Sequence, residues 1–193
     1  MKKVLATSAL TLSMLLSLGT TTFAATPSYD IENKLLLNYN REMTLSENEC
    51  IVSQNVEWLS EDEFIIETVS SSYETVSFSL NARNSGTRKN TVKKEHGHRV
   101  TGGFVVTGTA TLTCEFKYNS DNNTVSCTSK TYSFKPGSGV KMEKNGKITV
   151  TNNSGFLFIK PSVTVTLPYT FTAASGASTD YTLSMTCDTD GNI

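Results

Sequence analysis

Apolar and polar side chains alternate along one unusually long stretch, from Phe104 to Tyr118. Its even positions are apolar or small, and its odd positions are nearly all polar. A period of two held this long predicts a β-strand with one face in a core and the other in water. Residues 119–123 are rich in turn-forming Asn and Asp, and residues 124–134 return as a partner strand. The pattern therefore predicts a central hairpin on which the rest of the chain packs.

Further strand patterns follow this hairpin at short spacing. Two of them flank the pair Asn145-Gly146, which favours the tight turn of a hairpin between residues 140–143 and 148–151. The next pattern, residues 156–167, contains Pro161, and a proline inside a strand marks an edge or a break because it has no N–H to donate.

The last pattern is a second hairpin, formed by residues 169–171 and 181–187 around the loop Ala173 to Ser178. Many short strands with polar turns between them are typical of stacked or closed antiparallel sheets. We therefore predict an all-β fold, an antiparallel β-sandwich or a barrel.

The part between residues 25 and 84 is less regular. Its apolar residues lack a clean period, and two matches to a helix capping box, Ser46–Glu49 and Ser60–Glu63, predict one or two short helices. From Glu63 onward the pattern turns to strand. A polar, basic connector begins at Asn81, and we expect three parts: a leader (1–24), an acidic N-terminal segment (25–84) and a β-sandwich domain (85–193).

The first 24 residues have the pattern of a secretory signal peptide. Met1-Lys-Lys3 precedes the apolar run Val4 to Gly19, and Thr22-Phe-Ala24 supplies the small residues expected before a cut between Ala24 and Ala25. The alternative is a membrane anchor, but Thr and Ser interrupt the run and a cleavage pattern ends it. We expect a secreted, extracellular protein without a membrane anchor.

Charge is unevenly distributed along the remaining chain. Residues 25–80 hold 11 acidic and 2 basic side chains, whereas residues 81–193 hold 7 acidic and 13 basic ones. Opposite signs are expected if the acidic segment is held against the basic domain, although two solvated surfaces that never meet would give the same counts. The overall excess of acidic residues argues against nucleic acid as a partner.

Both histidines lie in Glu95-His-Gly-His98. On a strand, His96 and His98 would point to the same side and could share a copper or zinc ion, with Glu95 nearby. Two ligands do not make a metal site and no third is identifiable, so we expect a solvated loop. A serine hydrolase would need one of these histidines as its base, and the chain contains no G-x-S-x-G elbow.

Three other patterns have ordinary structural explanations. The acids of Glu61-Asp-Glu63 could serve glycoside hydrolysis, but acids at a predicted helix start normally interact with the helix dipole. Asp188 to Asn192 resembles the start of a calcium loop, and a terminal turn explains it better. The ladder of threonines at 107, 109, 111 and 113 suits the wet face of a sheet. We therefore assign no catalytic residue, no metal ligand and no cofactor.

Four cysteines in an exported chain predict two disulfides, with three possible connectivities. Cys114 and Cys127 would face each other across the central hairpin if its turn centres on Ser120-Asp121, so their pairing is geometrically permitted. A bridge that ties the last strand to the centre would gain about 1 kcal/mol more in loop-closure entropy. This margin leaves the connectivity open.

The chain resembles a group of small secreted β-proteins of Gram-positive gut bacteria, which have no established activity. The resemblance covers roughly the last hundred residues. It lies in Ser85-Gly-Thr-Arg88, Val106-Thr-Gly-Thr109, Phe116-Lys-Tyr-Asn119, Val125-Ser-Cys-Thr-Ser129 and Leu183-Ser-Met-Thr-Cys-Asp-Thr-Asp-Gly-Asn192. It implies a disulfide between Cys127 and Cys187, which leaves Cys50 to pair with Cys114.

Three functional hypotheses follow. The first, which we favour, is a non-catalytic extracellular binding protein whose partner is a cell-wall polymer or another extracellular protein. The second is a secreted antagonist, such as a bacteriocin-like toxin or a protease inhibitor, and the third is a secreted hydrolase. The sequence leaves the ligand and the oligomeric state open.

Overall fold

The computed structural model describes residues 35–36, 49–73, 85–155 and 159–193. Nearly all of this described part is extended chain. It forms the strands β1 (Glu49–Trp58), β2 (Glu63–Tyr73), β3 (Ser85–Val100), β4 (Gly103–Asn119), β5 (Thr124–Pro136), β6 (Lys141–Lys144), β7 (Thr149–Asn153), β8 (Ser162–Thr172) and β9 (Ser178–Asp188).

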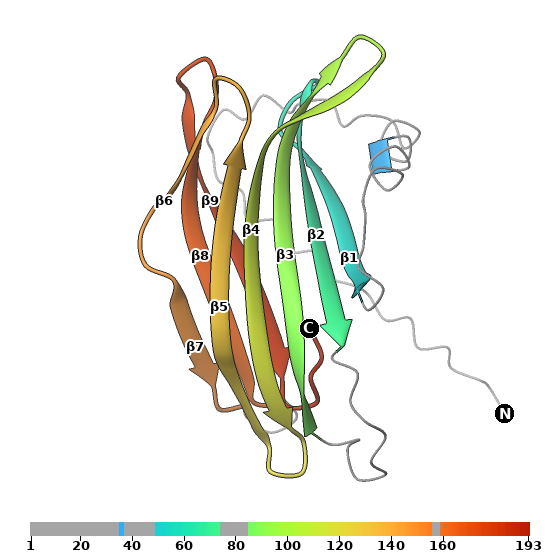
Figure 1. The fold of residues 1–193 in the computed structure, drawn as a ribbon, viewed down its shortest axis with the longest axis vertical. Helices are drawn as coiled ribbons and strands as arrows, with labels where there is room; N and C mark the ends of the chain where they lie inside the picture. The colour runs from blue at the N-terminus through green and yellow to red at the C-terminus, as the bar shows by residue number, and fades with distance from the viewer. Residues whose placement is uncertain (1–34, 37–48, 74–84, 156–158) are drawn as a thin grey trace, which may run out of the picture.

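The strands form two antiparallel sheets that stack face to face (Figure 1). One sheet has the order β1-β2-β3-β4-β5; in the other, β8 is central, with β6 and β7 on one side and β9 on the other. The main core lies between the sheets, where alternate residues such as Leu112, Phe116, Val165, Leu167 and Leu183 are fully buried. The predicted all-β sandwich is confirmed, and the sheets are not closed into a barrel.

The central hairpin is β4 and β5, as the alternation predicts, but its inward face is not continuous. From Gly108 to Phe116 the even positions are buried in the core. At Thr107 the register with β3 shifts, because His96 pairs with Gly108 and the next residue, Gly97, pairs with Val106. An extra residue in one strand moves all following side chains to the opposite face. The prediction that Phe104 and Val106 belong to the same face as Gly108 is therefore wrong.

Phe104 instead joins a second apolar cluster on the outer face of the five-stranded sheet. Its ring centroid lies 5.8 Å from that of Phe64 and 6.4 Å from that of Trp58. Leu35, which is 2% exposed, and Ile66 complete this outer cluster. Both faces of this end of the sheet therefore carry apolar residues, which is why the sequence pattern does not show the bulge.

The acidic segment is part of the sandwich over the residues that the structure describes. β1 and β2 lie in residues 25–84, which the sequence analysis separated from the β domain, and β2 pairs with β3 from Glu63–His98 to Tyr73–Arg88. The expected boundary after residue 84 therefore falls within one sheet. Leu35 also packs on this sheet.

The capping box at Ser60 forms a turn and not a helix. Ser60 Oγ accepts the backbone N–H groups of Asp62 and Glu63, as a capping serine would. The carbonyl of Glu63, however, accepts the N–H of Leu59, which closes a tight connection between β1 and β2. The same local hydrogen bonds serve helix caps and turns, so the pattern alone could not distinguish them. Most of the other match, Ser46–Glu49, lies outside the described residues.

β6 and β7 do not form the hairpin predicted from Asn145-Gly146. Both pair with β8, on the same side of that strand, so they form one edge strand with a break in the middle. Pro168 of β8 lies opposite the break, and its carbonyl accepts the N–H of Asn145. In a strand the N–H and C=O of one residue point to the same side, so the N–H that Pro168 lacks would also face this edge.

The strands predicted at residues 156–167 and 169–171 are one strand, β8, over the residues that the structure describes. Pro161 directly precedes β8 and marks its start, and β8 and β9 form the last hairpin around residues 173–177. The leader and the cleavage position between Ala24 and Ala25 lie outside the described residues. Among the residues that are described, no helix has the length and apolar character needed to cross a membrane.

Candidate functional site

One end of the sandwich is hollow. The β1–β2 turn, the β3–β4 hairpin and the loops after β5 and β8 meet there, at the upper end in Figure 1. They enclose a cavity of about 560 Å³, which we call the end cavity. Its lining comes from both sheets and comprises Leu59, Glu63, Phe64, His96, Gly97, His98, Thr107, Ser138, Val140, Phe171, Ala173, Ala174, Ser175, Ala177, Thr179 and Tyr181.

The size of the lining side chains explains the space. The β8–β9 loop contributes Ala173, Ala174, Ser175 and Ala177, which are too small to fill the gap between the sheets. Deeper in the sandwich, larger side chains fill the same gap with a continuous core. The end cavity is therefore the point at which core packing stops, bounded by rings on the inside and small residues at the mouth.

His96 lies in the lining at the inner end of this cavity. It is 3% exposed, on the inward face of β3, and its Nε2 lies 2.7 Å from the hydroxyl oxygen of Tyr169. The imidazole stacks on the ring of Phe171, with centroids 4.2 Å apart, and the ring of Tyr181 lies at 4.7 Å. The expectation of a solvated loop is wrong for His96, because β3 continues through it to Val100.

Burial sets the protonation state of this group. The pKa of His96 falls from 6.5 to about 4, first because burial disfavours the charged imidazolium and second because of the nearby positive charge of Lys94. Burial likewise raises the pKa of Tyr169 and that of Tyr181. At neutral pH these three aromatic groups are therefore uncharged.

His98 also lines the cavity, as expected for the second of two alternate positions on a strand. It pairs across the strands with Glu63, which lies at the start of β2. His96 is already held by Tyr169, and among the described residues no three His, Cys, Asp or Glu side chains are placed to hold a metal ion.

All four cysteines are free thiols in the structure. Cys50 of β1 and Cys114 of β4 have two strands between them, Cys50 pairing with Ser71, Ser71 with Asn90, and Asn90 with Cys114. Three strand spacings amount to about 14 Å, and a disulfide needs Cα atoms within about 7 Å. The fold therefore excludes the expected Cys50–Cys114 bridge.

Cys127 has a different neighbour from the one that the resemblance implies. A register shift at Thr128 places Cys127 opposite Phe116, and its thiol is close enough to that of Cys114 for each to affect the pKa of the other. Cys187 lies on the other sheet, in β9. The pairing that the geometry favours is thus Cys114 with Cys127, the alternative that the sequence left open.

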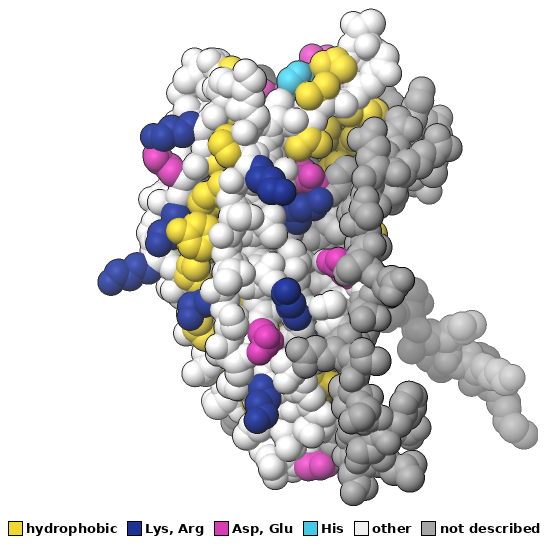
Figure 2. Space-filling model, in the orientation of Figure 1, with side chains coloured by type: hydrophobic (Ala, Val, Ile, Leu, Met, Phe, Trp, Pro, Cys, Tyr) yellow, Lys and Arg dark blue, Asp and Glu magenta, His cyan; other side chains and the backbone are white. Residues whose placement is uncertain are grey.

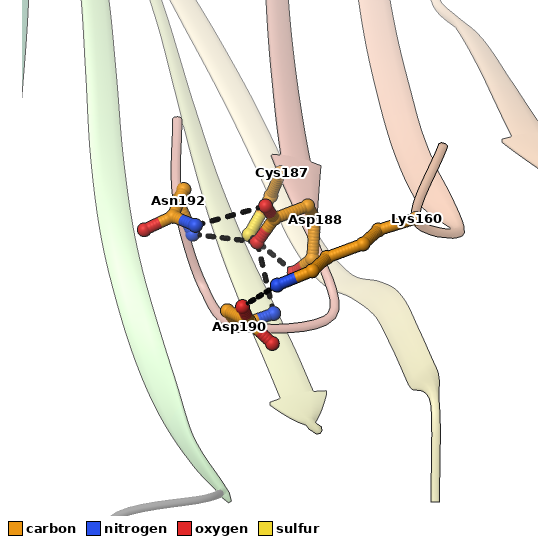
Figure 3. Close-up of polar contacts among 5 residues, drawn as sticks. All are labelled: Lys160, Cys187, Asp188, Asp190 and Asn192. Atoms are coloured by element: carbon orange, nitrogen blue, oxygen red, sulfur yellow. Dashed lines mark hydrogen bonds and ion pairs between the residues drawn. The ribbon is translucent and has the colours of Figure 1, made fainter. Parts of the chain in front are cut away.

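The segment Asp188–Asn192 is a turn closed on its first side chain (Figure 3). The carboxylate of Asp188 accepts the backbone N–H groups of Asp190 and Asn192, each at 2.8 Å, and the side-chain amide of Asn192. Burial alone would raise the pKa of Asp188, but these hydrogen bonds and the charge of Lys160 together lower it. Lys160 also pairs with Asp190. The backbone N–H groups of Asp190 and Asn192 and the amide of Asn192 thus occupy the space beside the Asp188 carboxylate that a calcium ion would need.

Sequence reasoning did not identify most of the cavity. Phe171 and Tyr181 were interpreted only as strand residues, residues 173–178 only as the loop between them, and Glu63 as part of a helix start. The run Ala173-Ala-Ser-Gly-Ala177 between two aromatic strands was the available signal, because a loop of such small residues cannot cap a sandwich tightly. The threonines of β4 behave as expected for a sheet surface, and Thr113 hydrogen-bonds Thr91 across the strands.

Comparison with known proteins adds no relative to this description. Neither the protein-family models, nor the curated proteins, nor the solved structures include a match to this chain.

Proposed function

We propose that this protein is a secreted, non-catalytic binding protein that takes up a small, largely apolar ligand in the end cavity. The observation that carries the proposal is the cavity itself. Its volume of about 560 Å³ falls within the range of small-molecule sites, and it joins aromatic walls to a few hydroxyl groups. Rings of Phe171 and Tyr181 would contact the apolar body of a ligand, and hydroxyls of Ser138 and Thr179 would orient it.

The chemistry of the buried groups favours binding over catalysis. A general base works best when its pKa lies near the working pH, and His96, with a pKa of about 4, is a weak base. A thiol nucleophile must ionise, yet burial raises the pKa of Cys114 and that of Cys187 to about 12. A hydrolase or a thiol enzyme built on these groups would be poorly poised at neutral pH.

The surface supports a second role, attachment to an anionic polymer of the cell wall. Figure 2 shows Lys and Arg side chains along the length of the visible face, with fewer acidic ones between them. Exposed lysines lie on several strands and turns: Lys89, Lys117, Lys130, Lys135, Lys141, Lys144 and Lys147. Attraction of such a surface to wall polymers would keep the protein, and its ligand, close to the cell.

Binding in the end cavity can be tested with N-phenyl-1-naphthylamine, an uncharged fluorescent probe of apolar sites. We expect saturable binding at one site by the chain from residue 25 onward. Thr179→Trp, which fills the cavity from β9, should abolish this binding. Thr182→Trp, an exposed position on the same strand, is the matched control and should leave it intact.

Two results would contradict the proposal. The first is the absence of saturable binding, or equal binding by the two tryptophan variants. The second is a hydrolytic activity of the purified protein that a His96→Ala, His98→Ala double variant abolishes.

A further inference from the structure

The charged groups beside the end cavity are predominantly acidic. Glu63 lines it, and Glu57 on β1 is close enough to act with Glu63 on the phenol of Tyr181. Within the described residues neither carboxylate has an ion-pair partner. Glu61 and Asp62, in the turn between these strands, add two further negative charges at the same end of the sandwich.

The positive groups in this region do not cancel that charge. Lys94 of β3 is ion-paired with Glu67, at 3.0 Å, so this pair contributes no net charge. His96 is neutral at physiological pH because burial lowers its pKa. Arg99 is exposed on the outer face of the sheet, and the loops 137–140 and 173–179 contain no charged residue. Among the lining residues other than His98, the carboxylate of Glu63 is thus the one side chain that is charged at neutral pH.

The aromatic walls of the cavity also favour a positively charged ligand. The faces of aromatic rings carry partial negative charge, and cations bind over them with an energy that grows when water is excluded. Phe171 and Tyr181 place two such rings around the space that Glu63 borders. An anion would meet both the rings and the carboxylate unfavourably, and a neutral ligand would use only the apolar walls.

We propose that the ligand of the end cavity is an organic cation, with an apolar or aromatic body held between the rings and a protonated amine at the carboxylate of Glu63. This inference rests on the proposed binding function and narrows its ligand class.

Three indoles of similar size separate charge from shape: tryptamine is a cation, 3-ethylindole is neutral and indole-3-propionate is an anion. Isothermal titration calorimetry at pH 7 and low salt would give their affinities for the chain from residue 25 onward. We expect tryptamine to bind at least about tenfold more tightly than 3-ethylindole, as a charge-assisted contact allows, and the anion to bind most weakly. Added salt should weaken the binding of tryptamine and leave the binding of 3-ethylindole unchanged.

A variant then assigns the effect to one side chain. Glu63→Gln should lower the affinity for tryptamine about tenfold and leave that for 3-ethylindole unchanged. The control is Glu61→Gln, which removes an exposed charge from the same turn without touching the lining. If Glu63→Gln does not fold, the salt dependence of the unmodified protein still tests the preference for a cation.

The outcomes distinguish the two proposals. Equal affinity for the three indoles would overturn the cation preference and leave the binding cavity standing. Failure of all three indoles and of the uncharged probe would overturn both. Loss of tryptamine affinity in Glu61→Gln as large as in Glu63→Gln would refute the direct contact with Glu63.

Discussion

His96 shows how burial can redefine a residue that looks functional in the sequence. Its imidazole would be a proton carrier in water, but here Phe171 and Tyr181 enclose the ring and Tyr169 binds its Nε2. A buried polar group is tolerated when it has a hydrogen-bond partner, and His96 has one in the hydroxyl of Tyr169. The histidine therefore acts as an uncharged, planar part of the cavity wall.

This environment predicts a pH dependence of stability. The pKa of His96 is about 4 in the fold and 6.5 in the unfolded chain, so between these values only the unfolded state takes up the proton. The free energy of unfolding should fall as the pH is lowered from about 6.5 towards 4, by roughly 3 kcal/mol from this group. Urea denaturation at a series of pH values measures the change.

Carboxylates such as Asp188 also lose stabilising interactions at low pH, so the comparison must be with variants. In His96→Phe the part of the slope between pH 6.5 and pH 4 that is due to this group should disappear, whatever the stability at pH 7. His98→Gln is the control and should retain it. An unchanged slope in His96→Phe would show that the imidazole is not buried in the uncharged form.

The cysteines give a second prediction at the scale of single residues. Oxidative refolding of the chain from residue 25 onward, followed by peptide mapping without reduction, should yield a Cys114–Cys127 peptide. The reason is that these thiols lie on the neighbouring strands β4 and β5, contact the same core, and are close enough to affect each other's pKa. A Cys50–Cys114 peptide from folded protein would contradict the order of strands in the five-stranded sheet.

Among the elements, the end of the β3–β4 hairpin has little room for an added side chain. Gly97 pairs with Phe64, and a Cβ added to it would lie 2.7 Å from Cε2 of that ring and 2.8 Å from the carbonyl oxygen of Val105. The absence of a side chain lets the ring of Phe64 lie over β3 and reach Phe104. A side chain at Gly97 would therefore clash both with this ring and with the backbone of β4 beside the bulge.

Gly97→Ala should accordingly destabilise the protein by about 1 to 3 kcal/mol, the usual cost of overpacking. Gly103→Ala is the matched control, since a Cβ there would meet no atom within 4 Å, and it should change stability little. Thermal unfolding followed by circular dichroism compares the two variants. Equal stability would mean that the ring of Phe64 does not pack on Gly97.

These elements also show what a sequence can and cannot reveal. The alternation from Gly108 to Phe116 predicted β4 because one of its faces is core and the other is solvent. Phe104 was assigned to the wrong face because both faces are apolar near the bulge. Asn145-Gly146 was read as a hairpin turn, although Gly146 serves a break in an edge strand, with a φ of 118°.

The candidate site was hidden for a different reason. Its residues come from β2, β3, β4, β8, β9 and three connecting loops, and only their placement in two facing sheets brings them together. His96 and His98 were noticed as a pair, but their partners Tyr169 and Phe171 lie more than 70 residues along the chain. Hydrophobic periodicity identifies a core and carries no information on where that core ends.

At the scale of the molecule, the part of the acidic segment that is described contributes two strands of one sheet. We predict that residues 85–193 alone will not fold cooperatively, because removing β1 and β2 leaves the edge of β3 unpaired and takes the buried side chain of Ile65 out of the sandwich. The chain from residue 25 onward is the control. Urea unfolding and the dispersion of amide NMR signals measure the difference, and a sharp unfolding transition of 85–193 would refute the prediction.

The proposed attachment to wall polymers is also a property of the whole surface. Purified cell walls should sediment together with the chain from residue 25 onward at low salt, and less of it as salt increases, because exposed lysines are screened within about 10 Å at 0.1 M. The His96→Ala, His98→Ala variant should sediment equally well. Binding that does not depend on salt would remove the electrostatic basis of the attachment.

The break between β6 and β7 has a consequence for molecules that meet one another. A sheet grows between copies of a protein when an outer strand offers an unbroken row of backbone groups to a second chain. Here that row stops after four residues, resumes for five, and is bordered by the exposed side chains of Lys141, Lys144 and Lys147. Because Pro168 has no N–H to donate, the edge strand is interrupted opposite it, and this limits the length over which another strand could pair. The interruption should therefore protect a concentrated protein from fibril formation along this side.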